Sequence, residues 1–344
     1  MALDERKLKI LDTIVKEYIQ TAEPVGSRTL SKNAGINISA ATIRNEMADL
    51  EEMGYLYQPH TSAGRVPSEK AYRLYVDQLM QIFELDQLLE DEIKSVYMNY
   101  MNELTKAIEQ TAALLSRITN YTSLVLAPGA RSLNCKYVKL MPLEEENILM
   151  VLITKEKIVK NFVITLSAPA DEAQLEKVNN VLNICLKDSS LADLSDQLAD
   201  KIDALSHEEG VMLQEVIPLF KKALLESDKE VVYAEGMDKI FNFPEFADID
   251  KAKRLIEALN KQNVLANLLS DDTSSDMNIR IGEENQVEAF KDCSLITATY
   301  KINGRPIGTV GVVGPTRMNY DYVVSVLDFL REELNAHISR LLNE

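Results

Sequence analysis

The stretch of the chain from Ser68 to Ala127 contains neither glycine nor proline. Apolar residues recur along it at the three-to-four spacing of an α-helix, namely Ile82, Leu85, Leu89, Ile93, Val96, Tyr100, Leu104, Ile108, Leu115 and Ile118. The pattern predicts one long helix, or two nearly continuous helices, that connect an N-terminal head to a larger C-terminal body. Such a stripe serves either as a seam between two subunits or as packing against the chain's own body, and we favour packing.

The N-terminal head is predicted to contain three helices. Apolar residues at helical spacing cover 4–20 and indicate an amphipathic first helix. Ser27 suits the cap of a short second helix, 28–33, which ends where glycine supplies a left-handed turn. Ser39 suits the cap of a third helix, 40–53.

A short hairpin is predicted directly after the third helix. The segment 55–59 has the residues of an extended strand, 61–64 has the small polar residues of a turn, and 65–66 leads back. Helix, helix, turn, helix and hairpin, in that order, form the pattern of a winged helix-turn-helix, which is a DNA-binding fold.

The residues expected to contact DNA follow from that pattern. The N-terminal end of the second helix of the motif enters the major groove, where arginine reads guanine and asparagine reads adenine. That end comprises Ser39, Ala40, Ala41, Thr42, Arg44 and Asn45. We expect Arg28 and Lys32, on the preceding helix, to contact phosphates. We expect Arg65 to enter the minor groove, and four residues to lie near the DNA backbone, namely His60, Thr61, Ser62 and Lys70.

Beyond residue 120 the apolar spacing changes from helical to strand-like. Strands are predicted over 123–127, 136–141, 148–154 and 158–166, and again over 294–302 and 307–313, with Asn303-Gly304 as a tight hairpin turn. Helices are predicted over 171–186, along an interrupted stretch from 191 to 270, and over 321–342. Strands on both sides of a helical block predict a multi-domain α+β protein with one domain inserted into a loop of another.

Composition excludes several classes of protein. Apolar residues make up 46% of the chain and charged residues 26%, as in globular proteins, and no run of about 20 apolar residues predicts a membrane span. The N-terminus lacks the apolar core of a signal peptide, so we expect a cytoplasmic protein. Cys135, Cys185 and Cys293 are isolated and predict reduced core thiols rather than disulfides or a zinc site.

Charge is unevenly distributed along the chain. The whole chain carries a formal charge of −17, which is unusual for a protein that binds phosphates. Residues 1–80 contain ten Lys or Arg against eleven Asp or Glu, so the negative charge belongs to the body. We expect an acidic body to repel non-specific DNA and to leave binding to the few cations of the head.

No group of residues predicts an enzyme, a metal site or a cofactor. Gly304, Gly308, Gly311 and Gly314 lack the spacing of nucleotide-binding loops, and close packing or a bulge within a strand explains them better. The three histidines are far apart and form no metal cluster. We expect residues 315–318 to form a structural turn, with the lining of a small-molecule pocket as the alternative.

Two segments resemble a known family. SAATIRNEMADLEEMGYLYQPHTSAGRVPSEKAYRLYVD resembles the N-terminal signature of the HrcA family of heat-inducible transcription repressors, and SLITATYKINGRPIGTVGVVGPTRMNYDYVVSVLDFL resembles that family's C-terminal segment. Val66, where the family often has isoleucine, and 68–71, where Thr-Asp-Lys-Gly is common, are departures that leave the hairpin intact. The resemblance covers nearly the whole chain and is weakest over 190–276.

The resemblance implies an architecture and a function. The architecture is a winged helix-turn-helix over 1–80, a connecting helix over 81–120, a GAF-like domain made of 121–190 and 277–344, and a helical dimerising domain over 191–276 inserted into it. The function is that of a homodimer that binds an inverted-repeat operator of double-stranded DNA upstream of chaperone operons. Heating would inactivate the repressor, and the GroE chaperonin would keep it folded and active.

Two other classes of function remain open. A one-component regulator would bind a metabolite in its GAF-like domain, and the ligand would shift operator affinity at constant temperature. A protein-interaction scaffold would use its winged helix against protein and would show no sequence-dependent DNA binding.

Overall fold

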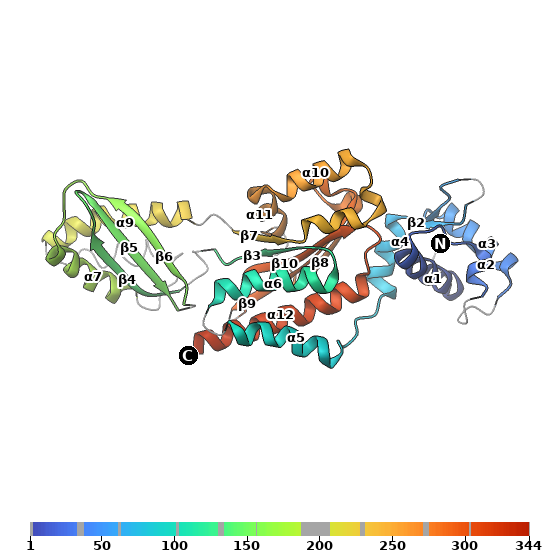
Figure 1. Cartoon of the computed structure of the whole chain (residues 1–344), viewed down its shortest axis with the longest axis horizontal. Helices are drawn as coiled ribbons and strands as arrows, with labels where there is room; N and C mark the ends of the chain where they lie inside the picture. The colour runs from blue at the N-terminus through green and yellow to red at the C-terminus, as the bar shows by residue number, and fades with distance from the viewer. Residues whose placement is uncertain are drawn as a thin grey trace.

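The structure is a computed structural model that describes residues 3–32, 38–60, 63–100, 103–129, 134–155, 157–186, 207–227, 231–270, 275–302 and 304–343. The molecule is elongated, with a head at one end, a central body, and a smaller unit at the other end (Figure 1). Helices and sheets together make it a mixed α+β protein, as predicted. Among the described residues, no helix has both the length and the apolar character that crossing a membrane requires.

The head contains the three helices and the hairpin that the sequence predicts. They are α1 (Glu5–Thr21), α2 (Ser27–Leu30), α3 (Ala40–Glu52), β1 (Leu56–Tyr57) and β2 (Val66–Pro67). Asp4 and Ser39 cap α1 and α3, since each side chain accepts a hydrogen bond from an amide in the first turn. Helix α2 is shorter than predicted and begins at Ser27, so Gly26 occupies its cap position without a side-chain hydrogen bond.

The prediction of one long helix, or two nearly continuous helices, after the hairpin is wrong. The segment contains α4 (Glu69–Leu74), the π-helical turn η1 (Tyr75–Leu79), α5 (Gln87–Asn99) and α6 (Leu104–Thr119). Residues 80–86 run without helical structure between η1 and α5, and Asp86 caps α5. The apolar stripe is nevertheless used as we favoured, because Ile93, Ile108 and Leu115 are buried in the chain's own core.

A five-stranded antiparallel sheet forms the centre of the body. Its strands, in spatial order, are β7 (Val232–Glu235), β3 (Thr122–Leu126), β10 (Arg305–Pro315), β9 (Cys293–Ile302) and β8 (Met277–Ile281). Helices α6 and α12 (Tyr320–Asn343) cover one face, and α10 (Ile249–Leu259) and α11 (Gln262–Ser270) cover the other (Figure 1). Two short edge strands, β7 and β8, were not predicted.

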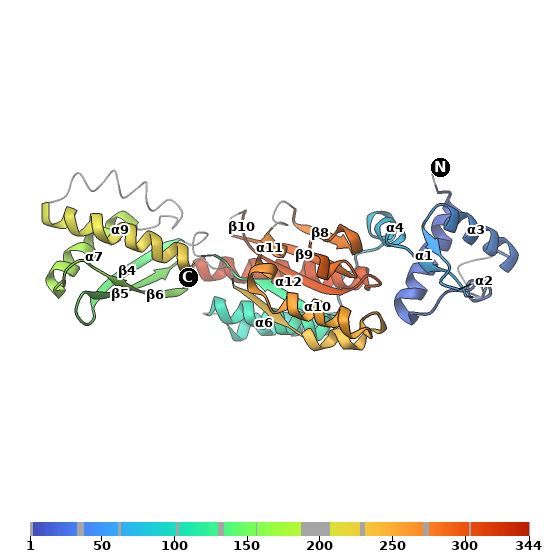
Figure 2. The same cartoon turned by 90° about the horizontal axis from the view of Figure 1, so that it is seen from above.

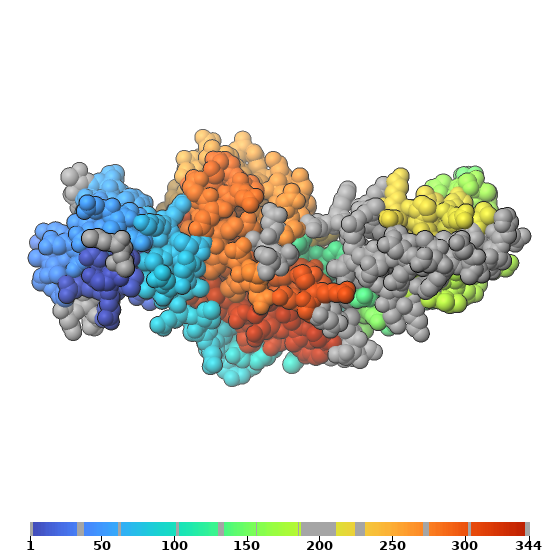
Figure 3. Space-filling view, turned by 180° about the vertical axis from the view of Figure 1, so that it is seen from behind, coloured from blue at the N-terminus to red at the C-terminus, as the bar shows by residue number. Residues whose placement is uncertain are grey.

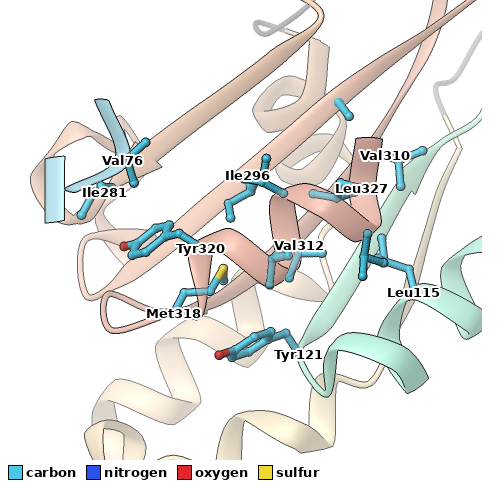
Figure 4. Packing of buried hydrophobic residues seen from close by; sticks show 14 of the residues in the cluster. Val76, Leu115, Tyr121, Ile281, Ile296, Val310, Val312, Met318, Tyr320 and Leu327 are labelled. Carbon is cyan, nitrogen blue, oxygen red and sulfur yellow. The ribbon is translucent and has the colours of Figure 1, made fainter. Parts of the chain in front are cut away.

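The core between the sheet and α12 extends toward the head. Figure 4 shows Ile296 and Val312 of the sheet beside Leu327 of α12, with Tyr320 at the first turn of that helix. Val76 of η1 belongs to the same buried cluster, which continues into the head as far as Ile10 of α1. Head and body therefore share one continuous apolar core.

The glycine-rich run of β10 serves close packing, as predicted. A Cβ atom at Gly308 would lie 2.2 Å from the hydroxyl of Tyr300 and 2.4 Å from the carbonyl oxygen of Leu126. The Tyr300 hydroxyl donates a 2.7 Å hydrogen bond to that same carbonyl, across the strand. The ladder between β9 and β10 also shifts register between Pro306 and Gly308, which is a local bulge.

The smaller unit has a sheet and a core of its own. Strands β4 (Cys135–Pro142), β5 (Asn147–Thr154) and β6 (Val159–Thr165) form an antiparallel sheet in the order β4-β5-β6. Helices α7 (Glu172–Leu186) and α9 (His207–Ser227) cover one face of it (Figure 2). The buried residues of these five elements form a cluster separate from the two clusters of the body.

The smaller unit is inserted between two neighbouring strands of the body. Strands β3 and β7 pair antiparallel, with Leu126 opposite Val232, and the amide of Ala127 donates a 2.9 Å hydrogen bond to Val231. The chain can thus leave and return at one place, because adjacent ends of antiparallel strands lie side by side. An insertion is present, but the predicted limits 191–276 do not match this packing: β4, β5 and β6 belong to the insert, and 232–270 packs on the body.

The packing of α12 on α5 includes one buried imidazole. His337 is 2% exposed, its ring centroid lies 5.5 Å from that of Tyr97, and its Nε2 has no hydrogen-bond partner among the described residues. Burial lowers the pKa of His337 below its ordinary value, and the nearby charge of Arg340 lowers it further.

The pH dependence of folding provides a test of this packing. Because its pKa is depressed on folding, His337 binds a proton more readily in the unfolded chain. Stability should therefore fall as the pH drops below about 6.5, by at most about 1.4 kcal/mol per pH unit. We expect His337→Phe to flatten this dependence in chemical unfolding measured between pH 5 and 7.5. The control His60→Gln, at an exposed position, should keep it, and equal slopes in all three proteins would contradict the prediction.

Candidate nucleic-acid interface

Helix α3 presents a small polar face at its N-terminal end. The hydroxyl of Ser39 accepts a 3.1 Å hydrogen bond from the amide of Thr42. Ala41, Arg44 and Asn45 are exposed, and Arg44 and Asn45 lie three and four positions after Ala41. The opposite face is buried through Ile43, Met47 and Leu50. The exposed face therefore offers one guanidinium and one amide between small side chains.

A cluster of charges holds α3 against α1. Glu46 lies on the buried face of α3, and its carboxylate is 2.6 Å from Lys7 Nζ and 3.3 Å from Arg6. Lys7 also lies 3.0 Å from Asp49. Hydrogen bonds that Lys7 donates to Glu46 and Asp49 raise the pKa of Lys7 above its ordinary value, so the amine stays charged. Contacts one turn apart on α3 fix its direction relative to α1.

Among the described residues, three cations near the exposed end of α3 have no acidic partner. Arg28 and Lys32 are exposed on and just after α2, which packs against α3. Within the part of the chain that the structure describes, no carboxylate lies within ion-pair distance of Arg28, Lys32 or Arg44, whereas Lys7, Arg65 and other head cations are paired. Lys9 of α1 is also exposed and without such a partner. Positive charge is therefore available where α2 and α3 meet.

The hairpin is attached to the rest of the head by its second strand. Val25 and Arg65 exchange two backbone hydrogen bonds of 2.8 and 2.9 Å. Gly64 lies so close that a Cβ atom there would be 2.4 Å from the carbonyl oxygen of Val25. His60 is exposed at the end of the hairpin, and Thr61 and Ser62, both predicted to lie near DNA, fall outside the described residues.

Two residues that were predicted to contact DNA contact other parts of the head instead. Arg65 Nε lies 2.8 Å from a carboxylate oxygen of Glu51, and only 19% of its side chain is exposed. Lys70 donates a 2.8 Å hydrogen bond to the carbonyl of Met53, and its amine lies 4.3 Å from the ring centroid of Tyr55. Lys70 thereby caps the C-terminal end of α3, where cations are favoured. Both cations connect the hairpin region to α3.

Sequence reasoning missed the residues that hold this interface in place. Glu46 could have been noticed, because it is a carboxylate within the apolar stripe of α3 and a buried charge needs a partner. Glu51 and Gly64 gave no such signal. Their roles depend on Arg65 and Val25, and only the folded chain brings those residues beside them.

Replacement of Gly64 tests the attachment of the hairpin. Gly64→Val should push Val25 and β2 apart and cost roughly 1–3 kcal/mol of stability, as overpacking does. The expected readouts are a lower urea midpoint and weaker DNA binding with α3 unchanged. Gly54→Val is unsuitable as a control because Gly54 has a φ of +78°, so Gly26→Ala, at a site with open space nearby, is preferred. Equal stability of both variants would contradict the close approach.

The other candidate sites are parts of the folded structure rather than binding sites. Residues 315–318 form the turn that we expected: Met318 is fully buried, and Arg317 pairs with Glu245. In the described ranges, no three His, Cys, Asp or Glu side chains gather as metal ligands would. Cys135 and Cys293 are buried free thiols, and burial raises the pKa of Cys293. Cys185 lies outside the described side chains.

The similarity to known proteins extends over the whole length of this chain. A family model described as the HrcA protein C-terminal domain matches residues 105–324. The chain is 42% identical to the heat-inducible transcription repressor HrcA of Ruminiclostridium cellulolyticum, over 100% of this chain and 99% of that protein. It is 41% identical to the protein of the same name from Brevibacillus brevis, over 98% of each. A solved structure described as a hypothetical protein has a TM-score of 0.67 at 24% identity, covers 99% of this chain, and supports the fold alone.

These relatives define the class of protein. Both are named as transcription repressors, and the extent of the match makes the chain a repressor of the heat-shock response rather than an enzyme. The chain belongs to the HrcA family of heat-inducible transcription repressors.

Proposed function

We propose that the protein represses transcription by placing the N-terminal end of α3 in the major groove of an inverted-repeat operator. The observation that carries this proposal is the exposed face of α3. There Arg44 has no acidic partner within the part of the chain that the structure describes, while Glu46 and Asp49 hold the helix in position. Arginine and asparagine are the side chains that read guanine and adenine through paired hydrogen bonds. Arg44 and Asn45 would therefore read bases.

The rest of the head would position α3 on the duplex. The head has the element order of a winged helix-turn-helix, in which α2 precedes the recognition helix and the hairpin is the wing. Arg28 and Lys32 would contact phosphates, Ser39, Ala40, Ala41 and Thr42 would let the helix approach closely, and His60, Thr61 and Ser62 would lie along the backbone. Arg65 and Lys70 would instead connect the hairpin region to α3, since their cationic groups are held by Glu51 and Met53.

The proposed repressor is a homodimer that associates through its inserted unit. Among the described residues, helices cover one face of the sheet β4-β5-β6, and its other face carries exposed apolar side chains. Tyr137 is 43% exposed, Val159 is 59% and Val163 is 65%. Ile153 lies in register between Tyr137 and Val159, and Leu149 lies beside Val163. An apolar sheet face of this kind marks an interaction site. A second copy would cover it in a symmetric dimer, as an inverted-repeat operator requires.

The proposed domain organisation follows from these units. The head over 1–80 is the DNA-binding domain, and residues 81–120 connect it to the body. The body, whose central sheet is covered by helices on both faces, is the GAF-like domain. The dimerising domain is the insert between β3 and β7, with limits shifted from those expected.

The proposed regulation is loss of the folded repressor on heating. The operator would lie upstream of chaperone operons in the cytoplasm, and the GroE chaperonin would refold the repressor. Chaperonin occupied by other unfolded proteins would then leave the operator free. This mechanism requires a small stability margin or slow refolding, because one or two kcal/mol is a large part of a typical margin.

Fluorescence anisotropy tests the proposed function. The full-length protein is titrated with a duplex carrying the inverted repeat and with a scrambled duplex, at several salt concentrations, before and after mild heating with and without chaperonin. We expect selective binding that heating abolishes and chaperonin restores. Equal binding to both duplexes would overturn the DNA-reading proposal.

The same titration separates the metabolite-responsive alternative. Selective binding that is indifferent to heat and changes with a small molecule at constant temperature would establish that alternative. The structure offers it no specific support at 315–318, where Met318 is fully buried. Within the described residues, a cavity of about 450 Å³ lies in the inserted unit, between residues 166–169, α7 and α9.

A further inference from the structure

Besides the apolar core that they share, two sets of polar contacts among the described residues join the head to the body, and the first is made by the connecting segment itself. Arg73 of α4 donates hydrogen bonds of 2.9 Å to Glu284 and 2.6 Å to the carbonyl of Ile279. The hydroxyl of Tyr75 donates a 2.6 Å hydrogen bond to Asp321 of α12. Aromatic packing adds to this attachment, since the rings of Tyr72 and Tyr320 lie 5.9 Å apart. Figure 3 shows this segment between the head and the body.

The second attachment is made by Arg317, which is on the body, in the turn between β10 and α12. Its side chain is 12% exposed and pairs through Nε with Glu245 of the short helix η5 (Pro244–Phe246). Its Nη1 donates a 3.0 Å hydrogen bond to the carbonyl oxygen of Ile19. The guanidinium also lies 5.8 Å from the ring centroid of Phe243. Glu245 and Phe243 thus hold Arg317 toward the head.

Ile19 lies in the last turn of α1, which ends at Thr21. The last four carbonyls of a helix have no partner within the helix, and the helix dipole makes this end attractive to a cation. No basic residue of α1 lies in this last turn. Arg317 therefore supplies from the body what a lysine or arginine of α1 would supply locally.

Two attachments constrain the head in a way that one does not. A head that is joined to the body only through a connecting segment can still rotate about that segment. A second contact, made by a different element, removes this rotation. Arg317 holds α1, and Lys7 of α1 holds Glu46 and Asp49 of α3. The direction of α3 is thereby tied to the body.

We propose that Arg317 is a positioning residue for operator binding, which sets the separation and direction of the two α3 helices in a dimer by fixing α1 to the body. The proposal rests on the function proposed above. It predicts different effects on binding by two heads and on binding by one head, which a purely structural role does not. Loss of Arg317 should impair binding that needs both heads at once and spare binding by one head.

Half-site and full-site duplexes test this distinction with the full-length protein. We expect Arg317→Gln to bind a single half-site within about twofold of the parent and to lose about tenfold or more on the inverted repeat, because the effective concentration of the second head falls. Lengthening the spacer by half a helical turn, about five base pairs, should weaken the parent strongly and the variant little. Arg331→Gln is the matched control, since Arg331 is a similarly buried arginine of the body, 16% exposed, that pairs with Asp328 of α12.

Each outcome decides the proposal. Equal losses on half-site and full-site duplexes, or an unchanged spacer preference, would overturn the positioning role while leaving the proposed function intact. Absence of sequence selectivity in the parent protein would overturn the proposed function itself. If Arg317→Gln fails to fold, Glu245→Gln replaces it, because it removes the charge that holds the guanidinium. A spin label at the exposed Ala48 then reports the distance between the heads without DNA, and an unchanged distribution would also reject the proposal.

Discussion

Val159→Asp combined with Val163→Asp should convert the protein to a monomer and reduce its operator affinity about 100-fold or more. Both side chains lie on β6 and point away from the core of the insert, with 59% and 65% of their surface exposed. Two carboxylates on this face leave the subunit's own packing intact but would be buried without partners in a dimer. A monomer loses the contribution of the second head, which is typically worth 10²–10⁴ in affinity.

Sedimentation and anisotropy together check this result. The matched control is Ile184→Asp, an equally drastic change at a residue of α7 that is 75% exposed in the same unit. The control should remain a dimer and bind the operator as before. A double variant that still sediments as a dimer would show that the apolar face of β4-β5-β6 is not the contact between subunits.

Arg44→Ala should cost roughly 1–3 kcal/mol of binding free energy on the operator, about 5- to 150-fold, and relax the preference for one base pair. The reason is that Arg44 is exposed on α3 and has no carboxylate partner within the described residues, so its removal leaves folding unaffected. Competition with operators changed at each position in turn would locate the base pair concerned.

A cation of the same kind elsewhere in the head provides the control for Arg44. Lys9 of α1 is exposed and without an acidic partner among the described residues, so Lys9→Ala should change affinity only slightly and equally for all sequences. Equal losses on cognate and scrambled DNA after Arg44→Ala would assign Arg44 to a phosphate contact instead.

Local chemistry explains which parts of the head could be predicted. A serine before a helical run and a glycine after it are signals carried by neighbouring residues, and Ser39 caps α3 while Gly54 follows it with a positive φ. The exposed and buried faces of α3 follow from spacing alone. The inward direction of Arg65 and Lys70 could not be predicted, because Glu51 and the carbonyl of Met53 reach them only after the hairpin has folded back.

Sheet membership could not be predicted for a different reason. The alternation in 136–141 or 148–154 shows that a strand has one buried face, but it carries no information about which partner it pairs with. The strands of the insert and of the body therefore have similar sequence patterns. The break at 80–86 was missed because the chain bends there without glycine or proline, and the apolar stripe continues on both sides of the bend.

The insertion between β3 and β7 has a consequence for the order in which the protein is made. Strand β3 ends at Leu126, but its neighbours begin only at Val232 and Arg305. A growing chain therefore exposes an apolar strand until most of the remaining sequence has left the ribosome. Pairings this distant along the chain form slowly, and chains that wait with open strand edges tend to aggregate. Each newly made subunit would thus need assistance in folding before it can act as a repressor.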